Sequence, residues 1–147
     1  MGFTKIYNHT YDYITTDSEI VDLRNRCNAD SVLCVGGGIR GDDNMRLVAC
    51  GNCLSVLSVT ALNTPNYVGS AYWYYTPDKS FGFSPSSSIS QTICDSSNQN
   101  DNLRLCWHTD NQSGGWRLGN ITYLNSDSGY SKYVFLKMSK TTFFIKY

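Results

Sequence analysis

Apolar and polar side chains alternate along many short stretches of the chain. In residues 103–108, leucine, leucine and tryptophan occupy every second position, which is the period of a strand with one buried face. The same pattern predicts strands over residues 4–13, 31–35, 45–50, 54–62, 71–76, 81–84, 103–109, 116–118, 130–137 and 141–146. Clusters of Gly, Asn, Asp, Ser or Pro separate most of them. This spacing predicts an all-β fold, an antiparallel sandwich or barrel.

One segment has a helical pattern instead. Thr16 and Glu19 have capping-box spacing, and Ile20, Leu23 and Cys27 then follow at helical intervals. We therefore expect one short helix near residues 17–27. The polar stretches 84–90 and 95–102 are too short to divide the chain, so residues 1–147 are predicted to form a single β domain.

The six cysteines form an even set, which favours disulfides and an oxidising compartment. Cys94 and Cys106 bracket a polar loop of eleven residues, and closing such a loop removes about 3 kcal/mol of unfolded-state entropy. We predict that these two pair. The pairing of the others stays open: Cys27, Cys34, Cys50 and Cys53. A zinc or redox site at the Cys50-x-x-Cys53 spacing lacks a second short ligand pair, so disulfides or buried thiols are favoured.

Composition and charge narrow the choice of partners. Hydrophobic residues make up 41% and charged residues 16% of the chain, and twelve basic residues balance twelve acidic ones. This composition favours independent folding. Without a basic patch, neither nucleic acid nor anionic lipid is an expected partner. No apolar run is long enough for membrane insertion, and the first residues lack the apolar stretch of a secretory signal.

Catalytic chemistry has few suitable residues. There are two histidines, one glutamate and no G-x-S-x-G motif, so we expect no enzyme. A triad of His108, Asp110 and a serine is conceivable, but chance supplies such trios freely.

Two glycine-rich and acidic signals near residue 40 are weak. The spacing G-x-G-x-x-G at residues 36–41 lacks the following helix that a nucleotide site needs, and a flexible connection between strands is favoured. Asp42, Asp43 and Asn44 do not form an EF-hand pattern. We expect no cofactor and no metal.

The strongest candidate for binding is a predicted hairpin over residues 105–119, with one tryptophan on each arm and a polar turn that ends in Gly114 and Gly115. An indole could stack on an apolar ligand face while polar side chains give directional hydrogen bonds. The candidate ligand-binding residues are Trp107, His108, Asp110, Asn111, Trp116 and Arg117. In the alternative interpretation both indoles belong to the core and Arg117 is a structural bridge. Residues 71–75 pose the same choice, because alternation places Tyr72 and Tyr74 opposite Trp73 and Tyr75.

Several motifs together resemble a widespread group of secreted or surface-attached domains of microbes and simple eukaryotes. They are Cys-Trp-His-Thr at residues 106–109, Gly-Gly-Trp-Arg at 114–117 and Leu-Asn-Ser-Asp at 124–127, with Trp-Tyr at 73–74 and Phe-Gly-Phe at 81–83. The resemblance covers about residues 20–137. It implies an extracellular setting and a surface or adhesion role, and it brings no catalytic residues. Cys50, Cys53 and the tail after Lys137 depart from the pattern.

Two hypotheses of function follow. The first is a lectin-like extracellular or cell-surface module that binds a glycan or another cell-surface ligand through the aromatic and polar hairpin. The alternative is a self-assembling structural or adhesive protein, whose copies pair through edge strands and the C-terminal strand at residues 141–147. A deep pocket with His108 beside a carboxylate would favour an enzyme instead.

Overall fold

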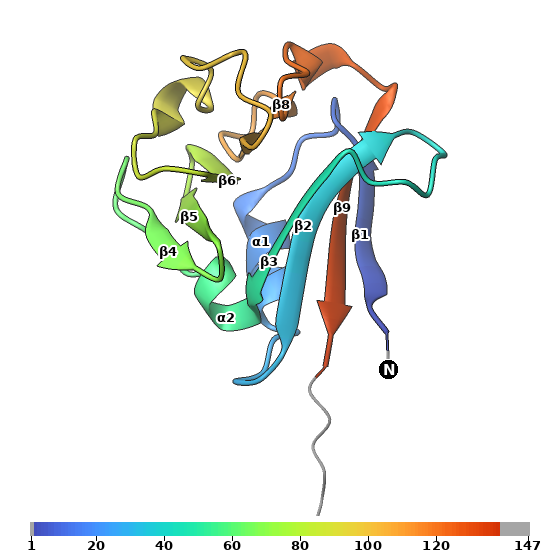
Figure 1. Cartoon of the computed structure of the whole chain (residues 1–147), viewed down its shortest axis with the longest axis vertical. Helices are drawn as coiled ribbons and strands as arrows, with labels where there is room; N and C mark the ends of the chain where they lie inside the picture. Colours follow the sequence, from blue (N-terminus) through green and yellow to red (C-terminus); the bar gives the residue numbers. More distant parts are fainter. Residues whose placement is uncertain (1, 139–147) are drawn as a thin grey trace, which may run out of the picture.

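The computed structural model describes residues 2–138, which form two antiparallel sheets enclosing a common core (Figure 1). The first sheet has the order β1-β9-β2-β3, with β1 (Thr4–Thr10), β9 (Tyr130–Lys137), β2 (Val32–Ile39) and β3 (Leu47–Asn52). The second has the order β4-β5-β6-β7-β8, with β4 (Asn66–Val68), β5 (Ala71–Thr76), β6 (Ser80–Ser84), β7 (Leu105–His108) and β8 (Gly115–Leu118). The predicted all-β sandwich is confirmed, and the described strands do not close into a barrel.

The core lies between the sheets and is rich in aromatic rings. Leu33 and Val134 face it from the first sheet, while Trp73, Phe81 and Trp107 face it from the second. The Phe81 and Trp107 ring centroids are 5.6 Å apart, and those of Trp73 and Phe81 are 6.2 Å apart. Such aromatic pairs add to the stabilisation that burial alone provides.

The predicted helix is present as α1 (Asp17–Arg24). The Thr16 side chain accepts a hydrogen bond from the Glu19 amide, and the Glu19 carboxylate accepts one from the Thr16 amide, which completes the capping box. Ile20 and Leu23 are buried against the core. The helix ends before Cys27, because the chain tightens into a turn there and Cys27 enters a disulfide.

All six cysteines are paired. The Cys94–Cys106 disulfide is confirmed. The two pairs that sequence reasoning left open are Cys27–Cys53, which ties the end of α1 to the short helix α2 (Cys53–Val56), and Cys34–Cys50, which bridges the adjacent strands β2 and β3.

Two predictions of local structure are wrong. Residues 54–62 do not form a strand, because the Asn52 side chain caps α2 by accepting a hydrogen bond from the Ser55 amide at 3.1 Å. The glycines at 36–38 belong to β2 rather than to a loop. The backbone of the neighbouring β3 comes so close there that a Cβ on Gly36 would lie 2.2 Å from the Leu47 oxygen. The predicted strand at 141–146 lies outside the described residues.

Candidate functional site

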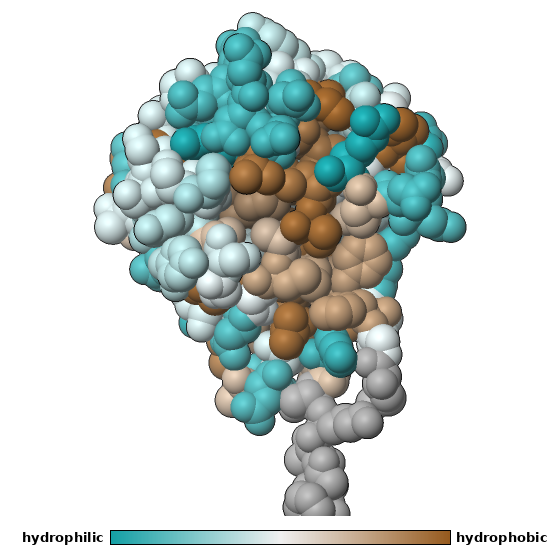
Figure 2. Space-filling view, viewed as in Figure 1, coloured by the Kyte–Doolittle hydropathy of each residue, from teal (hydrophilic) through white to brown (hydrophobic). Residues whose placement is uncertain are grey.

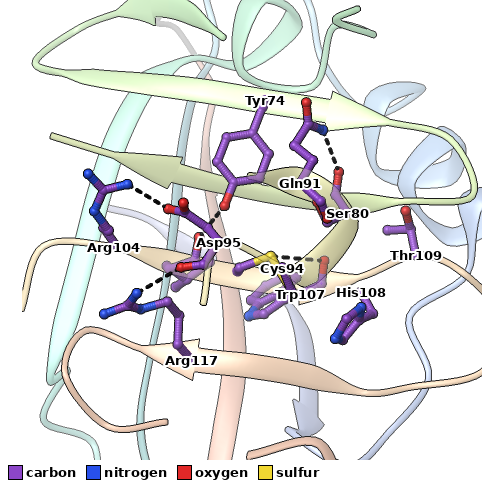
Figure 3. The surroundings of a disulfide bond; sticks show 12 residues. Tyr74, Ser80, Gln91, Cys94, Asp95, Arg104, Trp107, His108, Thr109 and Arg117 are labelled. Atoms are coloured by element: carbon purple, nitrogen blue, oxygen red, sulfur yellow. Dashed lines mark hydrogen bonds and ion pairs between the residues drawn. A yellow bond between two sulfur atoms is a disulfide. The ribbon is translucent and has the colours of Figure 1, made fainter. Parts of the chain in front are cut away.

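A segment from Pro85 to Arg104 covers the outer face of the second sheet. It contains the short helix η1 (Gln91–Ile93) and is fixed by the Cys94–Cys106 disulfide to β7 (Figure 3). Beneath it lies Tyr74, which is fully buried and donates a hydrogen bond from its hydroxyl to the Leu105 oxygen at 3.1 Å. A second, smaller cluster of buried side chains therefore packs outside the main core.

Arg117 is the central bridge of this covering segment. Its guanidinium donates to the backbone oxygens of Gly119 at 2.9 Å, Asp95 at 2.8 Å and Asp101 at 2.8 Å, and the residue has no exposed surface. All these partners belong to the protein itself. The ligand-binding role predicted for Arg117 is therefore wrong, and the structural alternative holds.

A buried ion pair stands beside this bridge and was not foreseen from the sequence. Arg104 donates to the Asp95 carboxylate at 2.9 Å and to the Asp101 carboxylate at 2.8 Å. Burial raises the pKa of the Asp95 carboxyl, and the hydrogen bond from Arg104 opposes that effect. In Figure 3 Asp95 lies between Arg104 and Arg117. The polar residues of this face thus hold the covering segment in place.

Trp107 is equally unavailable to a ligand. It has no exposed surface, and its ring lies 6.0 Å from that of Tyr7 and 5.6 Å from that of Phe81. Strand β7 lies between β6 and β8 in its sheet, and the inward face of β7 packs against the main core. The prediction that Trp107 contacts a ligand is wrong for this reason.

His108, Asp110 and Asn111 lie at the turn between β7 and β8. The His108 Nδ1 atom is 3.6 Å from an Asp110 carboxylate oxygen, and the other oxygen accepts hydrogen bonds from the Gln112 and Ser113 amides, both at 3.0 Å. Asn111 is exposed, with a left-handed backbone at φ 60°. Asp110 therefore stabilises the turn, and Asn111 is exposed to solvent there.

The electrostatics of His108 give no sign of a built catalytic group. Burial lowers its pKa, and the charge of Asp110 opposes this only in part. Within residues 2–138 no hydrogen bond joins the imidazole to a serine, and no described pocket is lined by His108. The absence of enzymatic activity stays a prediction.

Of the two tryptophans predicted to bind a ligand, Trp116 is the one with exposed surface. It is half-buried, and its ring meets that of Tyr123 edge to face, with centroids 4.4 Å apart. Tyr123 is 66% exposed and has a left-handed backbone at φ 61°, where it precedes the short helix η2 (Leu124–Ser126). An aromatic residue in this conformation is uncommon and costs about 1–3 kcal/mol. We call this pair the Trp116–Tyr123 platform.

A hollow rich in amide side chains adjoins the platform. The Gln99 amide lies within 3.5 Å of the Tyr123 hydroxyl as a hydrogen-bond donor. The hollow measures about 620 Å³ and is lined by Ser97, Asn98, Gln99, Asn100, Asp101, Asn102 and Arg104. The sequence predicted residues 97–102 as part of a polar loop and Arg104 as part of a strand, and it pointed to neither these residues nor Tyr123 as ligand-binding. In the sequence the hollow is marked only by a run of polar residues, and Tyr123 only as an aromatic residue outside any predicted strand.

Comparison of the chain with family models, with curated proteins and with solved structures finds no match. The resemblance to secreted surface domains therefore stays a prediction. None of the described helices is long and apolar enough to cross a membrane. In residues 2–138 no three His, Cys, Asp or Glu side chains gather closely enough to hold a metal ion.

Proposed function

We propose that this protein is a lectin-like extracellular module that binds carbohydrate at the Trp116–Tyr123 platform. The observation that supports this is the exposed Tyr123 ring, held in a costly backbone conformation beside Trp116 and next to a hollow of amide side chains. An exposed aromatic ring stacks on the apolar C–H face of a sugar. Amide side chains both donate and accept hydrogen bonds, as sugar hydroxyls require.

The disulfides bear on the compartment. Three disulfides that use every cysteine indicate a protein of an oxidising environment. An extracellular or cell-surface location is the proposal that fits this environment together with a role in glycan recognition.

A glycan array with the wild-type protein, followed by titration of the best ligand, tests the proposal. Tyr123→Ala should weaken binding at least tenfold and leave the thermal midpoint nearly unchanged. Tyr67→Ala is a matched control, because Tyr67 is 63% exposed and also meets its partner Tyr72 edge to face, at 4.9 Å. Folded wild-type protein that binds no glycan, or equal loss in both variants, would contradict the proposal.

The turn between β7 and β8 is a second place where the same ligand could make contact. Asn111 and Asp110 lie at the opposite end of the four-residue strand β8 from Tyr123. Asn111→Ala in the same titration decides whether the turn contributes. An unchanged affinity would confine recognition to the platform.

A second candidate function is self-association through strand β3. Among the described strands, β2 alone pairs with this strand, and Val48 on it is 45% exposed. A groove of about 200 Å³ runs beside it, lined by apolar residues that include Leu47, Phe83 and Leu103. Figure 2 shows apolar side chains gathered on this face of the molecule. A protein without net charge has little electrostatic repulsion between copies.

A further inference from the structure

A second groove lies on the outer face of the first sheet, away from the core. The connection between β2 and β3 reaches across the upper ends of β9 and β1 (Figure 1) and forms one wall. The volume is about 570 Å³, within the range of about 300–1,000 Å³ usual for small-molecule sites. The lining residues are Lys5, Asn8, His9, Thr10, Arg40, Gly41, Asp43, Ser131 and Tyr133.

Two unpaired cations face this groove from opposite walls. Lys5 comes from β1, and its Nζ lies 4.2 Å from the centroid of the Tyr133 ring, which orients the side chain. Arg40 comes from the connection after β2. Neither takes part in any ion pair of the described residues. Asp43 supplies the single carboxylate of the lining, so the two cations leave the groove with an excess of positive charge.

Two hydroxyls of the groove are built into the sheet rather than loosely exposed. Tyr133 and Ser131 point outward from β9 and are each only 3% exposed, and neither hydroxyl makes a hydrogen bond within residues 2–138. Both side chains are therefore held by packing in the lining of the groove. The Asn8 amide on β1 adds a further donor and acceptor beside them.

We propose that this groove binds the acidic group of a saccharide, a carboxylate or a sulfate, between Lys5 and Arg40. Paired cations from two walls recognise a compact anion, and the hydroxyls of Tyr133 and Ser131 with the Asn8 amide are suited to the sugar hydroxyls around it. Two cations, partly offset by Asp43, are too few for a polyanion such as nucleic acid, which needs a longer basic surface. This site is separate from the Trp116–Tyr123 platform and does not depend on it.

Titration of the full chain with three tetrasaccharides tests the proposal: a sulfated heparin fragment, an oligogalacturonate and a neutral maltotetraose. We expect both acidic probes, or one of them, to bind, with affinity that falls as salt rises, while maltotetraose does not bind in this groove. The double variant Lys5→Met with Arg40→Gln should weaken acidic binding at least tenfold. Methionine keeps an apolar stem over Tyr133.

Lys137→Met is the matched control, because Lys137 also stands over an aromatic ring, that of Phe3 at 5.8 Å, but does not line the groove. It should change acidic binding less than twofold. A preference for the sulfated or the carboxylated probe would identify which acidic group of a saccharide the groove binds. Equal binding by wild type and double variant, or no binding of either acidic probe, would overturn the proposal. Loss of binding in Tyr123→Ala alone would instead assign the ligand to the platform.

Discussion

Lys132 lies inside the sandwich, where its Nζ donates a hydrogen bond to the backbone oxygen of Tyr13 at 2.7 Å. A second hydrogen bond runs to the Thr15 hydroxyl at 2.8 Å, and the ammonium lies 5.4 Å from the Trp107 ring. Through these contacts β9 holds the segment that connects β1 to α1. Lysine is seldom fully buried, and burial lowers the pKa of Lys132 to about 7.

The first prediction is that stability rises with pH between about 7 and 9, below the range in which the tyrosines of the unfolded chain ionise. The folded chain releases the Lys132 proton near pH 7, whereas the unfolded chain keeps it to about pH 10.4. The unfolded state thus binds more protons in this window, and the free energy of unfolding increases with pH by up to about 1.4 kcal/mol per unit. Urea unfolding at several pH values, with the disulfides intact, measures this slope.

A variant without the Lys132 amine separates its contribution to the pH dependence from that of other titrating groups. Glu19 and Asp12 raise its pKa, and burial lowers the pKa values of His9 and His108, whose effects end below pH 7. Burial raises the pKa values of Tyr7, Tyr11, Tyr74 and Tyr75, so these groups oppose the slope only above about pH 9. Lys132→Met should flatten the slope between pH 7 and 9, while Lys137→Met on the exposed end of β9 should preserve it. A slope that survives in Lys132→Met would show that another group causes it.

The second prediction concerns the guanidinium of Arg117. Arg117→Met leaves the carbonyl oxygens of Asp95, Asp101 and Gly119 without their donor. Each unsatisfied buried group costs about 1–3 kcal/mol, so we expect a loss of about 3 kcal/mol or more in the free energy of unfolding. Arg117→Lys should not rescue it, because one ammonium cannot reproduce the planar fork of donors.

Arg46→Met serves as the control for that experiment, because Arg46 is exposed on the connection between β2 and β3. Its free energy of unfolding, measured in urea, should stay within about 0.5 kcal/mol of wild type. A small effect of Arg117→Met would mean that the segment over the second sheet does not need this bridge.

The third prediction separates two disulfides of similar loop length. The Cys94–Cys106 and Cys34–Cys50 bonds span 12 and 16 residues, so removal of either by paired alanines should cost about 3 kcal/mol in the chain-entropy account. Only the loss of Cys94–Cys106 should release the segment 85–104. Limited proteolysis should then cut within that segment, and identical cleavage patterns in the two variants would refute this assignment.

The sequence carries the alternation that forms the sheets and the capping box of α1, because both depend on neighbours a few residues apart. It also carries the Cys94–Cys106 pair, since a short polar loop between two cysteines favours closure. The roles of Trp107 and Arg117 depend instead on which face of the sheet packs against the core and which segment covers the other face. Alternation along β7 cannot reveal that a distant segment lies over the outer face, and this is why two candidate ligand residues proved to be structural.

Of the Trp116–Tyr123 platform, Trp116 was predicted from the sequence, whereas Tyr123 was missed for a related reason. Its aromatic ring is presented by a left-handed residue in an irregular connection, and no periodic pattern marks such a position. The buried position of Lys132 could not be predicted for a similar reason. Alternation along β9 places Lys132 on the same inward face as Tyr130 and Val134, yet its partners Tyr13 and Thr15 lie more than a hundred residues earlier in the chain.

The last prediction concerns self-association through β3. If copies pair along this strand, Val48→Lys should shift the wild-type oligomer toward monomer, because a charged lysine on an edge strand opposes pairing with a second edge. Val59→Lys is the control, since Val59 is 56% exposed and does not line the groove beside β3. Sedimentation velocity over a range of protein concentrations measures the effect, with circular dichroism to confirm that both variants fold. A wild-type chain that stays monomeric at the highest concentration would exclude this mode of assembly, and equal dissociation by both variants would place the contact elsewhere on the surface.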